Sequence, residues 1–180
     1  MDLVFAQQAL EFFSDSMDIV NAKPISDLTT NEYNAMLAGI VHGVIEQEHL
    51  TEIQTCIGDG KTEATNAYQA FENLWQHQWM TGIKEIAQIV EGLPTLMTDC
   101  TSISEDVATL ESWASVFLAP ASLESVIKTN VTHNLIKLTR DLHGAKKDWS
   151  DEHYYAFGTD LGVMLTIATQ PLTAEFEISE

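Results

Sequence analysis

The stretch Thr29–Val44, TTNEYNAMLAGIVHGV, predicts an amphipathic helix with a well-marked beginning. Thr29, Thr30 and Asn31 are short polar residues that suit a helix N-terminus, and Glu32 places an acid in the first turn. Six apolar residues follow at steps of three and four, the spacing of one helix face: Tyr33, Met36, Leu37, Ile40, Val41 and Val44. Because this spacing recurs along most of the chain, the sequence predicts an all-helical fold.

Prolines and glycines divide the first half of the chain into further helices. A first helix over residues 5–20 is expected to end before Pro24. A third helical segment over residues 50–57 is expected to break at Gly58-Asp59-Gly60, because each glycine costs about 1 kcal/mol in a helix interior. The apolar stripe of residues 64–75 predicts the next helix.

The second half shows the same alternation of stripes and interruptions. A short helix over residues 83–90 is expected to end at Gly92, a residue suited to the left-handed cap position. Pro94 then fits the first turn of a long helix over residues 93–117, which has the most regular pattern in the chain. Another long helix is expected over residues 123–142.

A last helix is expected over residues 154–168, capped by Ser150-Asp151-Glu152 and stopped by Pro171. The chain contains 180 residues, which is enough for a single domain with a substantial core. The sequence therefore predicts one bundle of six or seven helices over residues 1–171.

The C-terminal tail, residues 172–180, changes its period. From Leu172 onward apolar and polar residues alternate, as they do in a strand with one buried face, and Phe176 and Ile178 continue this pattern. A single strand has no partner in an otherwise helical chain. The tail is therefore interpreted either as a loose end or as a segment that pairs with a neighbouring subunit.

The charge of the chain excludes one class of partner. Twenty-seven acidic and eight basic residues give a net charge of −19, so nucleic acid would be repelled and anionic membranes are disfavoured. One cationic stretch, Lys137, Arg140, Lys146 and Lys147, is interpreted as favourable charge near a helix C-terminus. There is no run of about twenty apolar residues, so no transmembrane segment is predicted.

Two features favour an oxidising compartment. Cys56 and Cys100 can form one disulfide if the fold brings their Cα atoms within about 7 Å, and otherwise they would be two buried thiols. Asn130-Val131-Thr132 is an acceptor sequence for N-glycosylation at Asn130. The N-terminus lacks the pattern of a signal peptide, so the chain is interpreted as intracellular or as a mature secreted form, and the two features favour the second.

Two local clusters are candidates for a site. On a continuous helix His42, Glu46 and His49 would lie close to one face, which makes them weak candidates for metal ligands beside the alternative of a solvated helix face. Trp75 and Trp79 lie four residues apart and would share a face of one helix, either as an interface or as core.

Enzymatic chemistry has no clear signature in the sequence. The chain contains no Gly-x-Ser-x-Gly elbow, phosphate loop or dinucleotide fingerprint, and its carboxylates are too numerous to single out a catalytic pair. We therefore predict a protein that is not an enzyme, with no catalytic residues and no cofactor.

Several stretches resemble a large family of small, secreted, helical proteins predicted from ciliate genomes. The resemblance covers about two-thirds of the chain, and it rests on the order and spacing of its parts: Leu50–Asp59, Gly92-Leu93-Pro94 leading to Asp99-Cys100, Trp113–Phe117, and Tyr154–Gly158 with Leu161-Gly162. It implies that Cys56 pairs with Cys100 and that the protein enters the secretory pathway. It implies no active site.

Two functions fit these observations. The first is a secreted or lumenal structural subunit that self-associates, and forms a polymer or filament, through its tail and exposed aromatic residues. The alternative is a carrier that holds a lipid or another apolar small ligand in a cavity of the bundle.

Overall fold

The computed structural model describes residues 23–117 and 123–171, which form eight α-helices and two short 3-10 helices and contain no strand. The elements, in chain order, are η1 (Ile25–Asp27), α2 (Thr30–Ile45), α3 (Leu50–Cys56), α4 (Lys61–Trp75), α5 (Trp79–Leu96), η2 (Thr101–Ile103), α6 (Ser104–Phe117), α7 (Leu123–His133), α8 (Leu135–Ser150) and α9 (Tyr154–Thr169). The prediction of an all-helical bundle is confirmed. The expected helix over residues 5–20 and the tail, with Leu172, Phe176 and Ile178, lie outside the described residues.

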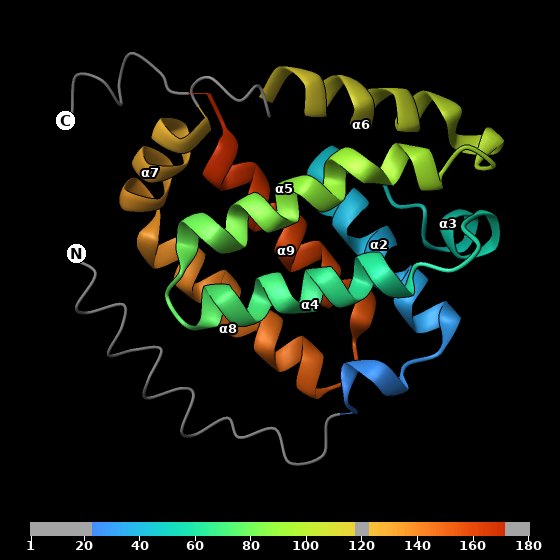
Figure 1. Cartoon of the computed structure of the whole chain (residues 1–180), viewed down its shortest axis with the longest axis horizontal. Helices are drawn as coiled ribbons and strands as arrows, with labels where there is room; N and C mark the ends of the chain where they lie inside the picture. The colour runs from blue at the N-terminus through green and yellow to red at the C-terminus, as the bar shows by residue number, and fades with distance from the viewer. Residues whose placement is uncertain (1–22, 118–122, 172–180) are drawn as a thin grey trace.

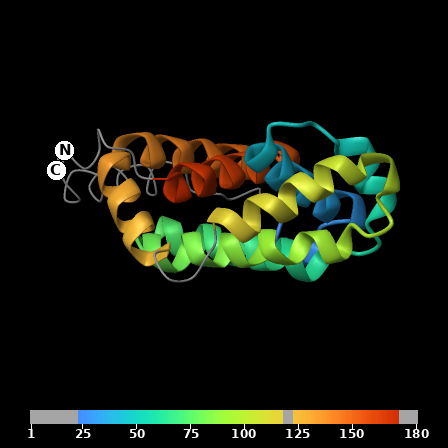
Figure 2. The same ribbon diagram turned by 90° about the horizontal axis from the view of Figure 1, so that it is seen from above.

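The helices form two main layers around the pair α2 and α9. These two helices cross in the middle of the molecule, and their contact is the most extensive between any two elements (Figure 1). Helix α8 packs beside α9 in one layer, and the hairpin of α4 and α5 forms the other (Figure 2). Helix α7 stands at one end and connects the layers, while α6 lies along α5.

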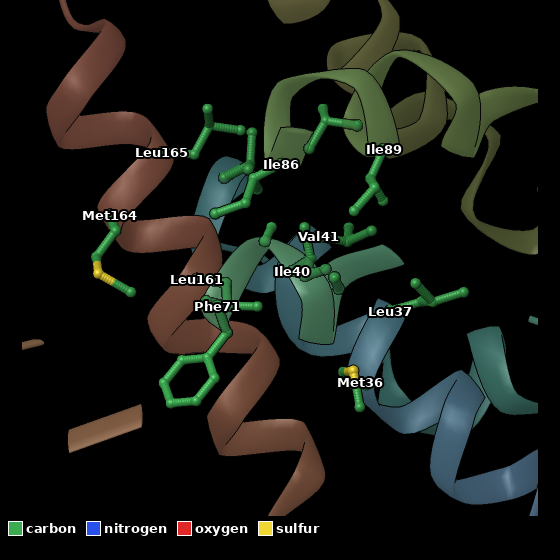
Figure 3. Close-up of a cluster of buried hydrophobic side chains, with 14 of the residues drawn as sticks. Met36, Leu37, Ile40, Val41, Phe71, Ile86, Ile89, Leu161, Met164 and Leu165 are labelled. Carbon is green, nitrogen blue, oxygen red and sulfur yellow. The ribbon is translucent and has the colours of Figure 1, made fainter. Parts of the chain in front are cut away.

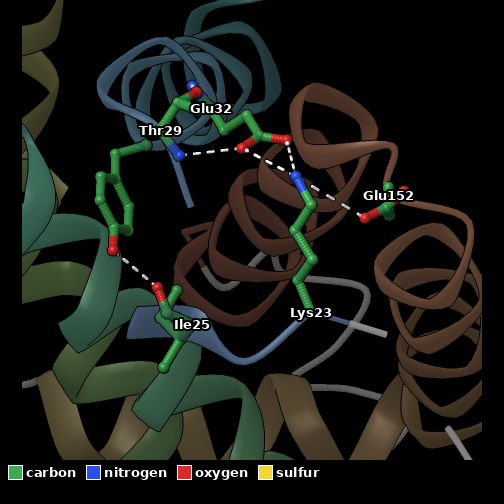
Figure 4. Close-up of polar contacts among 6 residues, drawn as sticks. Lys23, Ile25, Thr29, Glu32 and Glu152 are labelled. Carbon is green, nitrogen blue, oxygen red and sulfur yellow. Dashed lines mark hydrogen bonds and ion pairs between the residues drawn. The ribbon is translucent and has the colours of Figure 1, made fainter. Parts of the chain in front are cut away.

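Helix α2 begins as the sequence predicts. The Glu32 amide donates to Thr29 Oγ1 at 3.2 Å, and the Thr29 amide donates to Glu32 Oε1 at 2.9 Å, which together make a capping box. Lys23 Nζ lies 3.2 Å from Glu32 Oε2 and 3.9 Å from Glu152 Oε1, between α2 and the start of α9 (Figure 4). The Tyr33 hydroxyl donates to the Ile25 carbonyl at 2.7 Å, so the N-terminus of α2 is tied to η1.

Four glycines allow α2 and α9 to touch through their backbones. A Cβ atom added to Gly158 would lie 2.0 Å from the Met36 carbonyl oxygen, and one added to Gly39 would lie 2.1 Å from the Tyr155 oxygen. Gly43 and Gly162 face the opposite helix with equally little room. Any side chain at these positions would force the helices apart, because backbone atoms cannot move aside.

Apolar side chains fill the space around this contact. Residues from α2 and α9 meet residues from α4 and α5 in one continuous core (Figure 3). Its fully buried members include Met36, Leu37, Ile40, Leu74, Ile83, Ile86 and Phe157. Within the described ranges, none of the helices has both the length and the apolar character of a membrane span.

The predicted break at Gly92 and Pro94 is wrong. Helix α5 continues through both residues to Leu96, and within the described residues no glycine has a positive φ. A proline here removes only one intrahelical hydrogen bond in the last turn, which a long packed helix tolerates. The chain instead turns at residues 97–100, so the expected helix over residues 93–117 is divided, and Cys100 lies in the turn.

The expected helix over residues 123–142 is also divided, at Asn134. The side-chain amide of Asn134 (Nδ2) donates a hydrogen bond to the backbone carbonyl of Asn130 at 2.9 Å, and so satisfies an acceptor at the end of α7. Helix α8 then runs through Gly144 to Ser150. Ser150-Asp151-Glu152 therefore ends α8 and does not cap α9, whose N-cap, His153, makes no side-chain capping bond.

We expect Gly158→Ala to lower the free energy of unfolding by about 3 kcal/mol, because its methyl group would meet the Met36 carbonyl. Gly92→Ala is the matched control. Gly92 lies in exposed helix with no atom near its missing Cβ, so alanine there should stabilise by about 0.5–1 kcal/mol. Urea denaturation measures both changes. Equal effects of the two substitutions would contradict close packing of α2 on α9.

Candidate functional site

A disulfide between Cys56 and Cys100 joins the end of α3 to the turn before η2. The two Cα atoms are 5.1 Å apart, and the cysteines are separated by 44 positions in the sequence. Closing a loop of that length stabilises a fold by roughly 4 kcal/mol in the chain-entropy model. The pairing implied by the family resemblance is confirmed, and neither sulfur is available as a nucleophile.

The three weak metal candidates do not share one helix. Helix α2 ends at Ile45, and Glu46 takes a left-handed conformation with φ 60° as its C-cap. His42 Nδ1 and the Tyr155 hydroxyl are 2.7 Å apart, while His49 Nε2 lies 2.5 Å from Asp106 Oδ2. His42 thus contacts α9 and His49 contacts α6. Nowhere in residues 23–117 and 123–171 do three or more His, Cys, Asp or Glu residues gather as metal ligands.

Trp75 and Trp79 lie on different helices. Trp75 ends α4 and Trp79 begins α5, and between them His77 has a left-handed φ of 68°. Trp79 is buried, with 7% of its surface exposed. The half-buried Trp75 ring packs against His143, and Lys146 Nζ lies 4.3 Å from its centroid. Both rings hold the end of the α4–α5 hairpin, and their role in an interface between molecules stays a prediction.

Asn130 acts as a clamp between α7 and the end of α9. Its side chain is completely buried, and Nδ2 donates to the Ala168 carbonyl at 3.1 Å and to the Gln170 carbonyl at 2.8 Å. These two acceptors lie at the C-terminus of α9, where carbonyls lack helical partners. A glycan attached to Nδ2 would have to replace both bonds. Glycosylation of Asn130 stays a prediction, and this geometry opposes it.

An open groove of about 470 Å³ lies between the start of α5 and the outer side of α7. We call it the α5–α7 groove. Apolar side chains form its floor, and Lys128, which is exposed, stands at its border. Its lining residues are His77, Gln78, Trp79, Met80, Thr81, Ile127, Lys128, Val131 and Thr132. The sequence analysis missed it because the lining comes from two segments about fifty positions apart.

A basic recess adjoins the groove and shares Thr132 with it. The recess measures about 360 Å³ and lies at the junction of α7 and α8, where His133, Lys137, Arg140 and one acid, Asp141, are among its lining residues. Lys137 Nζ lies 3.8 Å from Asp141 Oδ2, so part of the positive charge is balanced within the recess. Ile136 lies on the same face, and within the described residues it is the one exposed large apolar side chain, with 46% of its surface accessible. Apolar and positive groups therefore gather on one side of an acidic molecule.

Three carboxyl groups meet where α8 packs against α9. Burial, together with a hydrogen bond with Asp148 and the charges of Asp148 and Asp141, raises the pKa of Asp160 to about 9. Burial also raises the pKa of Asp141, against the opposing charges of Lys137 and Arg140. Asp160 is therefore protonated at neutral pH. An acidic seam of this kind makes the packing of α8 on α9 depend on pH.

Comparison with known proteins identifies a family for the chain. A family model described as SctB-like, secreted protein B-like, matches residues 15–169, and the chain belongs to that family. No curated protein and no solved structure matches the chain. The family and the disulfide both fit an extracellular or secretory location.

We expect Asn130→Asp to lower the free energy of unfolding by about 2 kcal/mol, because an oxygen would then face two carbonyl oxygens. The control is Thr132→Ala, which also removes the glycosylation acceptor sequence but changes an exposed side chain. It should alter stability by less than about 0.5 kcal/mol. Thermal denaturation compares the variants. Equal stability of the two would show that the clamp contributes nothing.

The cluster of Asp141, Asp148 and Asp160 between α8 and α9 predicts how the free energy of unfolding changes with pH. The pKa of Asp160 is raised above its unfolded value near 4, so its stabilising contribution is complete below that value. The contribution is lost as pH rises toward the folded pKa. Asp160→Asn should make the protein more stable at pH 8 by about 1–2 kcal/mol, a figure kept small because water screens a partly exposed group. Denaturation between pH 5 and 8 measures this.

The control for this substitution is Asp99→Asn, which alters the net charge equally at an exposed position. Its stability should follow that of the original chain across the same pH range. If Asp160→Asn also kept the original pH dependence, the pKa of Asp160 would not be raised in the folded protein.

Proposed function

We propose that this member of the secreted protein B-like family is a non-enzymatic structural subunit that associates with its own copies through the tail. The family and the disulfide support work outside the cell or in the secretory lumen. The resemblance noted above adds a ciliate origin to the proposal. Under this proposal the function of the chain is to associate with other copies of itself and not to catalyse a reaction.

The distribution of positive charge supports this proposal most strongly. Molecules with a net charge of −19 repel one another, so self-association needs a local site where opposite charges meet. Five of the eight basic residues lie on α7 and α8: Lys128, Lys137, Arg140, Lys146 and Lys147. Lys137 and Arg140 line the basic recess and Lys128 lines the adjoining groove, so an acidic segment of another copy would be attracted there.

The tail has the complementary composition. Glu175 and Glu177 alternate with Phe176 and Ile178, so in an extended conformation these two acids would lie on the opposite side from the two apolar residues. The α7–α8 sector combines basic residues with an apolar groove and the exposed Ile136. Both surfaces therefore offer the same two kinds of contact with opposite charge.

A carrier of an apolar small ligand is the second candidate. The α5–α7 groove supports it, because its volume of about 470 Å³ falls within the range of small-molecule sites. Trp79, Ile127 and Val131 would supply apolar contacts there. Unlike assembly, this function does not need the tail.

Deletion of residues 172–180 separates the two functions. We expect the complete chain to assemble and the shortened chain to be monomeric, with self-association weakened at least about tenfold. Native mass spectrometry measures the assembly state of the complete chain from its natural source and of the shortened chain prepared by expression. Phe176→Ser with Ile178→Ser in the full chain keeps all acids and tests the apolar contacts alone, and we expect the same loss.

Two outcomes would contradict assembly through the tail. One is that the shortened chain forms the same multimers as the complete chain. The other is that the complete chain is a monomer that carries a discrete apolar adduct, in which case the carrier function would be correct.

A further inference from the structure

The position from which the tail starts is fixed by the hydrogen bonds that the side chain of Asn130 on α7 donates to the end of α9. Gln170 accepts a hydrogen bond from buried Asn130, and Pro171 is the last described residue. Nine residues follow, and in an extended conformation they reach about 30 Å. The tail therefore starts against α7, within reach of any surface on that helix.

The α5–α7 groove is built on another side of the same helix. Ile127 and Val131 lie three positions before and one position after Asn130, and their side chains form part of the floor of the groove. Lys128 and Thr132 are exposed at its edge, whereas Asn130 faces the end of α9. One helix thus carries both the root of the tail and a groove that suits the tail chemically.

The groove offers a contact for each kind of residue in the tail. Trp79 and Val131, which are 7% and 8% exposed, give Phe176 and Ile178 an apolar floor. Lys128 also lines the groove and is exposed, and the basic recess with Lys137 and Arg140 adjoins the groove at Thr132, so both could attract the acids of the tail.

We infer that the α5–α7 groove receives the tail of a second copy, and that two copies exchange tails about a twofold axis. This inference rests on the proposed function and names its acceptor site. Because the root and the groove belong to one helix, two molecules that face each other through α7 can exchange both tails at once. Such an interface uses the same surface on both subunits and closes after two copies. The filament expected from the sequence is then replaced by a dimer.

Disulfide trapping in the full chain tests this arrangement. One chain carries Thr132→Cys at the edge of the groove, and an isotopically labelled chain carries Glu177→Cys in the tail. Mild oxidation of an equal mixture should join labelled to unlabelled chains in about half of the dimers, the share that contains one chain of each kind when pairing is random. The control pairs Glu177→Cys with Ser112→Cys, an exposed position on α6, and should give little product. Peptide mapping verifies that Cys56 remains bonded to Cys100.

Charge reversal gives a second, independent measurement. Lys128→Glu should weaken dimerisation roughly tenfold because it places an acid against the acidic tail. Lys61→Glu is the matched control, since it changes the net charge equally at an exposed residue that begins α4, whose other end adjoins the groove. Its effect should stay within about twofold. Analytical ultracentrifugation at low salt measures both variants.

The outcomes distinguish the acceptor site from the proposed function. If a chain with both Thr132→Cys and Glu177→Cys links only within itself, its own tail fills the groove and the exchange is wrong. If no link forms although deletion of the tail still abolishes assembly, the function stands and the acceptor site is wrong. If no link forms and deletion of the tail does not affect assembly, both the acceptor site and the proposed function are wrong. Open filaments in place of dimers would overturn the twofold arrangement.

Discussion

The backbone contact between α2 and α9 is the constraint on which the rest of the structure depends. Gly39 and Gly43 on α2 meet Gly158 and Gly162 on α9 so closely that carbonyl oxygens take the place of side chains. At such short separation, dispersion forces act between the facing segments of the two helices, around residues 36–43 and 155–163. The pair forms a rigid centre for the bundle, and every other helix except α3 and α6 adds a layer around it or connects its layers.

Polar contacts hold the ends of this central pair. Thr29 and Glu32 cap α2, and Asn130 from α7 caps the carbonyl end of α9. Asn130 also donates a hydrogen bond to the carbonyl of Gln170, which lies just before Pro171 and the tail. The hydrogen bonds that cap the C-terminus of α9 therefore also determine where the tail starts. In the proposed dimer, stability and self-association would therefore both depend on α7, because the groove on this helix is the proposed site for the tail of a second molecule.

Much of the architecture could be predicted from local sequence. The capping box and the apolar stripes depend on residues within a few positions, so Thr29 and Glu32 were sufficient to place the start of α2. The glycine contact also left a signal, since Gly39 and Gly43, like Gly158 and Gly162, are spaced four apart, as on one helix face. Interpreting glycine only as an interruption hid that signal.

The remaining features depend on partners that are distant in the chain. The role of Asn130 is defined by carbonyls about forty positions away, and that of His42 by Tyr155, 113 positions away. A tripeptide pattern around Asn130 predicts only a modification, because it contains no information about burial. Gly92 and Pro94 continue α5 for a similar reason, since packing against other helices outweighs their local preference.

Native-state hydrogen exchange tests the central claim most directly. If the contact between α2 and α9 is the foundation of the fold, amides in the middle of both helices, such as those of Ile40 and Leu161, exchange only when the whole protein unfolds. Their exchange free energy should then equal the free energy of unfolding from urea denaturation. Exchange of either helix at a free energy lower by more than about 2 kcal/mol, while α4 and α5 remain protected, would contradict the account.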